Sequence, residues 1–257
     1  MRIRQFIAVS LLCFFTVAVA SAAEPGADRL SEPWWRERFA EKQQALRHGP
    51  VRLLLFGDSI LHSLEWQAHD PVWTHWYGNR DAVDLGFNGD RTINLIWRVQ
   101  HGELDGINPK AAVILIGAND SWESADTLTR QITQLVQDIH ARVPATRILL
   151  LSILPSGKPQ RDQEVARSVN HNLARIYGAP DAPARFLDVS CVFLRDGKLN
   201  AALFREHDVP GVSSPLHPTP EGMDLLAARI EPEVAQALGE QPHQPSHPLP
   251  RTDCPAG

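Results

Sequence analysis

The sequence predicts a three-layer α/β/α sandwich built on a parallel sheet, and two observations support this fold class. Short apolar runs recur along the chain without polar alternation, which is typical of strands that are buried on both faces. Segments with helical periodicity lie between these runs, and such alternation indicates a parallel sheet with right-handed crossovers. At 257 residues, of which 43% are hydrophobic, the chain suits one sizeable domain.

The chain begins with a segment typical of a secretory signal peptide. Arg2 and Arg4 precede an apolar run from Phe6 to Ala20, and small residues suitable for cleavage follow at positions 20–22. The run is too short, and too soon followed by these small residues, for a good membrane span. We therefore expect residues 1–22 to be removed, the mature protein to be periplasmic or secreted, and no stable membrane anchor to remain.

The folded domain is expected to cover residues 23–238. It starts with a helix between Ser31 and Gly49, in which Ser31 is the expected cap and Pro33 suits the first turn. Strands are then predicted at the apolar runs 51–56, 82–86, 111–116, 147–153 and 184–189, and helices near 91–102, 125–143 and 162–178. The last helix is expected from Pro220 to about Leu238, with Thr219 as its cap.

Residues 239–257 are rich in proline and poor in large apolar side chains, so we expect a disordered tail. The mature chain keeps two cysteines, Cys191 and Cys254, and the second lies in this tail. An oxidising compartment would permit a disulfide between them. Because one partner lies in a segment that should not fold, we expect two unlinked thiols instead.

The charge pattern excludes several classes of partner. The formal net charge is −5, and no stretch gathers lysine and arginine on one face, so nucleic acid is not an expected partner. The histidines are scattered, and none pairs with cysteine at the spacing of a zinc site. We therefore expect no metal.

Four short motifs carry candidate catalytic residues. Ser59 lies in FGDSI, Gly89 in GFNGD and Asn119 in GAND, and each motif directly follows a predicted strand. His217 lies in HPTPEG, just before the last helix. Each motif alone is also a common turn or helix cap. Because sites in such folds lie at the carboxyl ends of the strands, the four motifs together predict one active site at that edge.

This combination of motifs resembles the SGNH or GDSL hydrolases, and the segment NGDRTINLIWRVQHGELDGINPKAAVILIGAND resembles the platelet-activating factor acetylhydrolase catalytic-subunit group. The resemblance runs from about Pro33 to Leu238 and implies a flavodoxin-like fold with five parallel strands. It implies that Ser59 is the nucleophile and His217 its general base. It also implies an oxyanion hole made of the backbone N–H groups of Ser59 and Gly89 and the side chain of Asn119. Asp58 is expected to be a structural hydrogen-bonding residue in its turn.

One position departs from the family pattern. The family usually places an aspartate three residues before the histidine, and this chain has Ser214 there. Three explanations are open. In the first, His217 works as a dyad with Ser59 and is oriented by a backbone carbonyl or by the Ser214 hydroxyl. In the second, Asp208 supplies the carboxylate, and in the third the enzyme is impaired. We favour the dyad, because removing the acid from a triad slows catalysis by about 10⁴ yet leaves activity well above that of water.

The sequence thus predicts an exported serine esterase that cleaves short acyl esters, acetyl esters above all, without a metal or organic cofactor. A rival interpretation is a carbohydrate O-acetylesterase that acts on envelope or extracellular polysaccharide, since export would place the enzyme near such polymers. A second rival is a catalytically impaired binding protein that keeps the fold. The resemblance also suggests a homodimer, although no feature of the sequence demands one.

Overall fold

The computed structural model of the protein describes residues 24–120, 122–205, 215–248 and 252–254. The predicted signal peptide, residues 1–22, lies outside these residues, so its removal stays a prediction. Within the described part of the chain, no helix is both long and apolar enough to cross a membrane.

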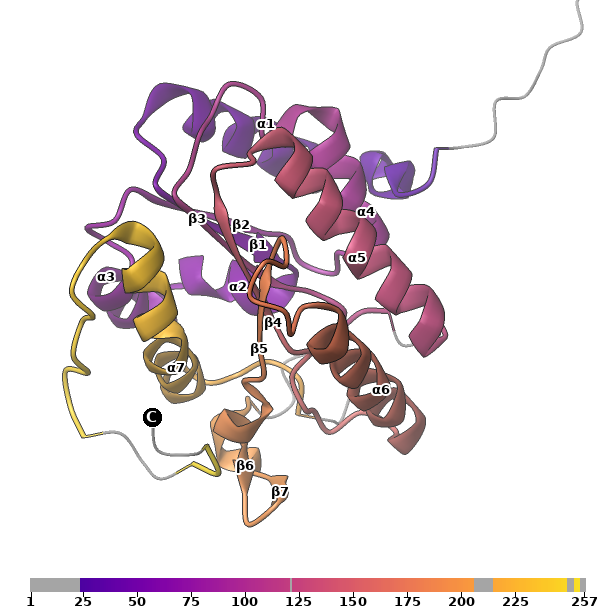
Figure 1. Ribbon diagram of the computed structural model, residues 1–257, viewed down its shortest axis with the longest axis vertical. Coiled ribbons are helices and arrows are strands. Elements are labelled where there is room, and N and C mark those ends of the chain that lie inside the picture. The colour runs from indigo at the N-terminus through magenta and orange to yellow at the C-terminus, as the bar shows by residue number, and fades with distance from the viewer. Residues whose placement is uncertain (1–23, 121, 206–214, 249–251, 255–257) are drawn as a thin grey trace, which may run out of the picture.

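A five-stranded parallel sheet forms the centre of the domain, as the sequence predicts (Figure 1). The strand order is β2-β1-β3-β4-β5. The strands are β1 (Leu53–Gly57), β2 (Ala82–Gly86), β3 (Ala111–Leu115), β4 (Arg147–Leu151) and β5 (Arg185–Leu187). The order reverses at β1, so the crevice beyond the carboxyl ends of β1 and β3 is where such sheets bind ligands.

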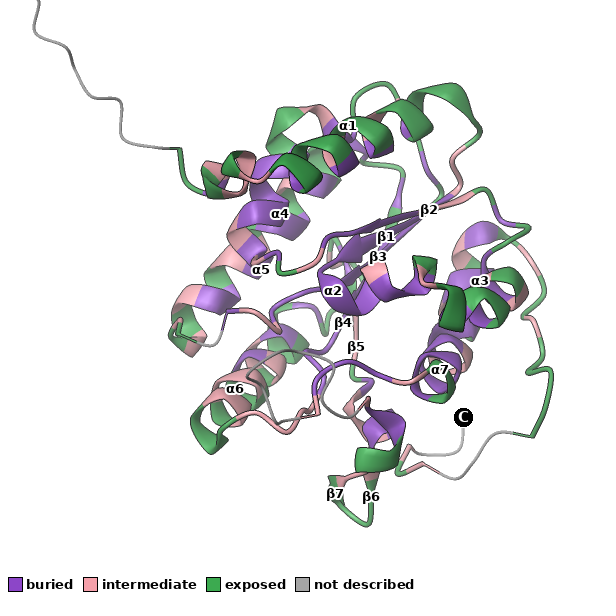
Figure 2. Ribbon diagram, turned by 180° about the vertical axis from the view of Figure 1, so that it is seen from behind, coloured by how far each residue is buried: buried purple, intermediate pink, exposed green. Residues whose placement is uncertain are grey.

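Helices cover both faces of the sheet and bury it (Figure 2). Leu54 and Phe56 of β1 pack on one side, against α1 (Pro33–His48), α4 (Thr92–Arg98), α5 (Ala125–Arg142) and α6 (Gln160–Ile176). Leu53 and Leu55 point to the opposite side, toward α2 (Ser59–His62), α3 (Asp70–Trp76) and α7 (Pro220–Leu238). Neighbouring residues of a strand point to opposite faces, so apolar runs without alternation are what a doubly covered sheet requires.

The helix caps are predicted correctly in one case and wrongly in another. Thr219 caps α7, since its hydroxyl accepts a hydrogen bond from the Gly222 N–H at 3.2 Å. Ser31 does not cap α1: it ends a short 3₁₀ turn, and its hydroxyl donates to the Asp28 carbonyl at 2.8 Å. Glu32 holds the cap position instead, directly before Pro33.

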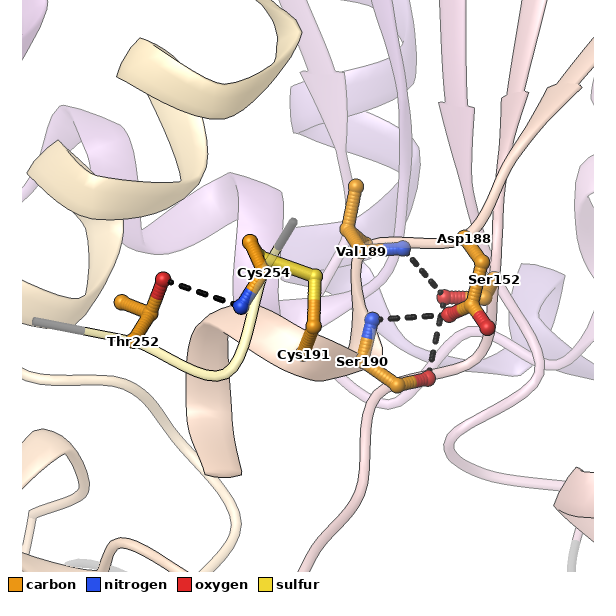
Figure 3. Close-up of a disulfide and its surroundings, with 7 residues drawn as sticks. All are labelled: Ser152, Asp188, Val189, Ser190, Cys191, Thr252 and Cys254. Atoms are coloured by element: carbon orange, nitrogen blue, oxygen red, sulfur yellow. Dashed lines mark hydrogen bonds between the residues drawn. A yellow bond between two sulfur atoms is a disulfide. The ribbon is translucent and has the colours of Figure 1, made fainter. Parts of the chain in front are cut away.

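The expectation of two unlinked thiols is wrong. Cys191 and Cys254 form a disulfide that joins residues 63 positions apart in the chain (Figure 3). Cys191 lies in a 3₁₀ turn over Ser190–Phe193, and the carboxylate of Asp253 accepts hydrogen bonds from the backbone of the adjacent hairpin of β6 (Leu194–Arg195) and β7 (Lys198–Leu199). Closing so long a loop stabilises the fold by restricting the unfolded chain.

The described residues of the tail, 239–248 and 252–254, contact the domain, and the expected disorder of the whole tail stays a prediction. Glu240 pairs with Arg80 at 3.1 Å and with Arg52 at 2.7 Å. The His243 N–H donates to the Glu231 carboxylate at 2.7 Å. Polar contacts and the disulfide hold this part of the tail, although its composition lacks the apolar surface that usually orders a chain.

Candidate active site

The sheet brings three of the four motifs to one edge. Gly57 at the end of β1 is in register with Gly86 of β2 and with Leu115 of β3. Ser59, Gly89 and Asn119 follow these strand ends by two, three and four residues. The carboxyl edge of the sheet therefore gathers them, as the sequence predicts, at the point where the strand order reverses.

The turn that presents Ser59 depends on Gly57 and Asp58. A side chain at Gly57 would lie 2.5 Å from the carbonyl oxygen of Leu115, so only glycine fits between β1 and β3. The Asp58 carboxylate accepts a hydrogen bond from the Ile60 N–H at 2.9 Å and caps α2. Asp58 is therefore a structural hydrogen-bonding residue in the turn, as the sequence predicts, and Ser59 is the first residue of α2.

Ser59 and His217 meet although they are 158 positions apart. The Ser59 Oγ lies 2.7 Å from the His217 Nε2. Ser59 is 9% exposed and His217 is 7% exposed, so the contact is sheltered from water. A hydroxyl beside an imidazole nitrogen at this distance has the geometry of a nucleophile and its general base.

Backbone hydrogen bonds fix the loop that carries His217. The Arg205 N–H donates to the His217 carbonyl at 2.8 Å, and the Thr219 N–H donates to the Leu203 carbonyl at 2.8 Å. On the other side, the Gly157 N–H donates to the Pro215 carbonyl at 2.7 Å. The loop is thus held between the 203–205 segment and the chain that follows β4, which positions the histidine backbone.

An aromatic cluster packs against the His217 ring. Trp66 stands edge-on to His217, with ring centroids 6.1 Å apart, and the Arg205 guanidinium lies 4.9 Å from the Trp66 ring centroid. His69 packs on Trp66 at 6.2 Å and is fully buried. Burial lowers the pKa of His69, and the positive charge of Arg205 lowers it further, so His69 is a neutral packing partner. The sequence analysis did not identify this cluster.

Asp208 and Ser214, the residues expected to orient His217, lie outside the described residues. Their roles stay predictions, and so do the three explanations of the missing aspartate.

Asn119 is tied directly to the Gly89 loop. Its side-chain nitrogen donates to the Asp90 carbonyl at 3.0 Å, which uses one of the two hydrogens of the amide. Gly89 has a φ of 74°, in the left-handed region that favours glycine, and the Asp90 N–H closes the turn on the Phe87 carbonyl at 3.1 Å. The Asn119 side chain and the backbone N–H groups of Gly89 and Ser59 are the three donors that the prediction assigns to an oxyanion hole.

Buried carboxylates anchor these loops beneath the site. Asp120 accepts hydrogen bonds from both the N–H and the hydroxyl of Thr92, at 3.1 and 3.0 Å, and so joins the GAND motif to the start of α4. Asp90 accepts from Trp35 at 2.7 Å and from Arg98 at 3.0 Å. Burial raises the pKa of Asp90 to about 6, although Arg98 opposes the rise. Asp90 and Asp120 lie within the quoted motifs, but only the structure shows that they anchor the loops.

Two cavities lie along the loops that carry the four motifs. One has a volume of about 660 Å³, and its wall includes Ile60 and Leu216, the chain neighbours of Ser59 and His217. The other has a volume of about 450 Å³, and its wall includes Gly89 and Asn119. Lys158 lines both, so the two cavities adjoin at this side chain.

Asp58 should make stability depend on pH. Burial raises the pKa of its carboxyl to about 7, and the negative charges of Asp120 and Asp90 add to the rise. Because the folded pKa lies above the ordinary value, the unfolded chain loses this proton first, and the free energy of unfolding falls as pH rises from about 4 to about 7. In Asp58→Asn, the amide oxygen still accepts from Ile60 but cannot ionise. We expect the variant to gain up to about 3 kcal/mol over the wild type between pH 4.5 and pH 8.

Urea unfolding at these two pH values measures the gain. Any fixed cost of the new amide hydrogens appears at both pH values and cancels in the difference. Parallel pH dependences for the wild type and the variant would show that Asp58 is already ionised at low pH in the folded protein.

The fold and the paired serine and histidine place the protein among the carboxylic ester hydrolases. Residues 55–225 match the sequence pattern of the GDSL-like Lipase/Acylhydrolase family. The chain belongs to this family.

Individual relatives agree with this membership. The platelet-activating factor acetylhydrolase IB subunit alpha1 of Bos taurus is 29% identical over 200 residues, which cover 77% of this chain and 81% of the relative. An acylhydrolase-type structure from Bacteroides fragilis has a TM-score of 0.62 at 20% identity, covering 79% of this chain and 96% of that one. The esterase EstA from Pseudoalteromonas has a TM-score of 0.52 at 16% identity, covering 74% and 99%. At these identities the two structures show a shared fold.

Proposed function

We propose that the protein is an exported serine esterase that hydrolyses short acyl esters, acetyl esters above all. The observation that carries the proposal is the buried contact of 2.7 Å between the Ser59 hydroxyl and the His217 imidazole. This contact also argues against a non-catalytic binding protein, because a binding site has no need of a hydroxyl paired with a base.

The reaction follows from this geometry in two halves. With its Nε2 unprotonated, His217 takes the proton of Ser59 as the serine oxygen attacks the ester carbonyl carbon. The tetrahedral intermediate collapses, and the leaving alkoxide takes that proton from His217 to depart as the alcohol. In the second half, His217 removes a proton from water, the hydroxide attacks the acyl-serine carbonyl, and the carboxylic acid leaves as Ser59 regains its proton.

The negative charge of each tetrahedral intermediate requires hydrogen-bond donors that stabilise it. We assign this role to the backbone N–H groups of Ser59 and Gly89 and to the side chain of Asn119. The hydrogen bond from Asn119 to the Asp90 carbonyl supports the assignment, because it holds the amide before substrate arrives. Donors that need no reorganisation during the reaction are the ones that stabilise a developing charge best.

Two further observations support the finer parts of the proposal. The Bos taurus relative carries the name acetylhydrolase, which favours a short acyl group. The disulfide between Cys191 and Cys254 favours an oxidising compartment, in agreement with the signal-peptide pattern at residues 1–22.

The test compares two chromogenic esters and labels the nucleophile. We expect p-nitrophenyl acetate to be hydrolysed faster than the octanoate ester, since the proposal assigns no long acyl chain to the site. A fluorophosphonate probe with a short alkyl group should label one serine, with loss of fluoride. Peptide mass spectrometry should find the label on the peptide that contains Ser59. Faster hydrolysis of the octanoate would assign the 660 Å³ cavity to a longer acyl chain and overturn the acetyl preference. A label on another serine would overturn the mechanism.

A further inference from the structure

The cavity beside Gly89 and Asn119 has a charged wall that the hydrolysis of a neutral ester does not require. Its volume is about 450 Å³, and its other described lining residues are Asp28, Arg29, Arg91, Trp122 and Lys158. Three cationic side chains thus line one small cavity together with one carboxylate, in a chain whose net charge is −5. Such a local excess of positive charge attracts anions.

The three cations differ in how far they are already neutralised. Arg29 pairs with Glu32 at 2.9 Å, and Arg91 pairs with Asp28 at 2.6 Å. Lys158 donates to the Ala118 carbonyl, and no carboxylate within the described part of the chain forms a salt bridge with it. An ammonium group has three donors. Lys158 therefore brings a positive charge without a salt-bridge partner among the described residues, and two further donors, to the point where the two cavities adjoin.

The same cavity exposes a large aromatic face. The Trp122 side chain is 60% exposed, and the Arg91 guanidinium lies 5.8 Å from its ring centroid. A flat apolar ring that faces solvent beside a reaction centre offers a stacking surface for a ligand ring. The pyranose ring of a saccharide presents a matching face of C–H groups, and its substituents can reach neighbouring cations.

We propose that the alcohol half of the substrate is a saccharide that carries a carboxylate or a phosphate. Its ring packs on Trp122, and its anionic group binds Lys158, with Arg91 adding positive potential. This inference rests on the proposed esterase function, and it assigns the substrate class of the same site. The acetyl carbonyl then lies beside Gly89 and Asn119, within reach of Ser59.

The test uses sugars that differ only in charge. Methyl glucuronoside and methyl glucoside, acetylated at the same hydroxyl, form one matched pair, and the correspondingly acetylated glucose 6-phosphate adds the phosphate source. Acetate release is followed at low and at high ionic strength. We expect kcat/KM of the anionic sugars to exceed that of the glucoside by about tenfold, mainly through KM, and salt to reduce the ratio. The more strongly preferred anionic sugar identifies whether carboxylate or phosphate is the natural group.

Two variants assign the preference to residues. Lys158→Gln keeps a donor for the Ala118 carbonyl but removes the charge, so the anionic-to-neutral ratio should fall to about one. Trp122→Ala should raise KM for both sugars and leave their ratio high. Arg147→Gln is the control, because Arg147 is an exposed cation at the amino end of β4, on the opposite edge of the sheet, and its loss should leave the ratio as in the wild type.

A binding experiment separates this inference from the esterase proposal. Calorimetry measures the binding of methyl glucuronoside and methyl glucoside, neither of which is an ester, to Ser59→Ala. In one outcome the wild type hydrolyses no ester, but Ser59→Ala binds the glucuronoside more tightly than the glucoside. If this difference disappears in the double variant that combines Ser59→Ala with Lys158→Gln, the anionic subsite stands and the esterase proposal falls. If the wild type hydrolyses p-nitrophenyl acetate but treats charged and neutral sugars alike in rate and binding, the anionic subsite is wrong and the esterase stands.

Discussion

Ser59→Ala is expected to abolish the enzyme-dependent hydrolysis of p-nitrophenyl acetate, with kcat falling by roughly 10³- to 10⁶-fold. The hydroxyl is the only atom lost, and its contact of 2.7 Å with His217 is the one that the proposed mechanism uses. His217→Ala should cost about as much, because an unassisted serine hydroxyl is a weak nucleophile. The double variant should lose little more than either single one, since the two residues act as a unit.

Matched variants separate chemistry from folding. Ser168→Ala removes an exposed serine from α6, and His140→Ala removes an exposed histidine from the last turn of α5. Both should hydrolyse the ester at the wild-type rate. Ser59→Ala should unfold at the wild-type temperature, because the change deletes one oxygen. Wild-type turnover in Ser59→Ala would refute the mechanism, and additive losses in the double variant would show that the two residues act separately.

The fold was predictable because its decisive signal is local. The run from Leu53 to Phe56 is apolar without interruption, and all four side chains are fully buried because helices cover both faces of β1. The cap of α7 was predictable for the same reason, since Thr219 and the Gly222 N–H are neighbours in the chain. Such signals need no knowledge of the tertiary structure.

The wrong expectation of two unlinked thiols arises where distant contacts override local composition. Residues 239–257 have the composition of a disordered segment, yet Glu240 finds Arg52 and Arg80, far away in the sequence. The disulfide depends on this docking, because Cys254 reaches Cys191 only when the tail lies against the domain. No pattern within the tail signals either partner.

The candidate site also has features that the sequence predicts and features that depend on the tertiary structure. Its motifs could be assigned to one edge because strand ends of a parallel sheet meet there, and the structure brings Ser59 and His217 together. The packing of Trp66 on His217 and the place of Lys158 in both cavities could not be predicted. Both depend on how loops from different strands fold over the edge, and neither residue lies in a motif.

The orientation of His217 gives the last prediction. Ser214 stands where the family usually has an aspartate, so in a dyad the imidazolium formed during the reaction lacks a carboxylate partner. Ser214→Asp is therefore expected to raise kcat on p-nitrophenyl acetate, by up to a few orders of magnitude if the geometry suits. The new negative charge favours the protonated ring, so the pH at which the rate reaches half of its maximum should move upward.

Asp208→Asn is the matched test of the competing explanation, because it removes the carboxylate that this explanation invokes while keeping the side-chain shape. In a dyad this variant should keep kcat within about twofold of the wild type, because the removed charge then takes no part in the reaction. If Asp208 already supplies the carboxylate, the outcome reverses: Asp208→Asn costs about 10³- to 10⁴-fold, and Ser214→Asp gains nothing because it places two like charges beside one ring. If neither substitution changes kcat or the pH profile, both accounts of how His217 is oriented are wrong, and the assignment of His217 as the base for Ser59 comes into question.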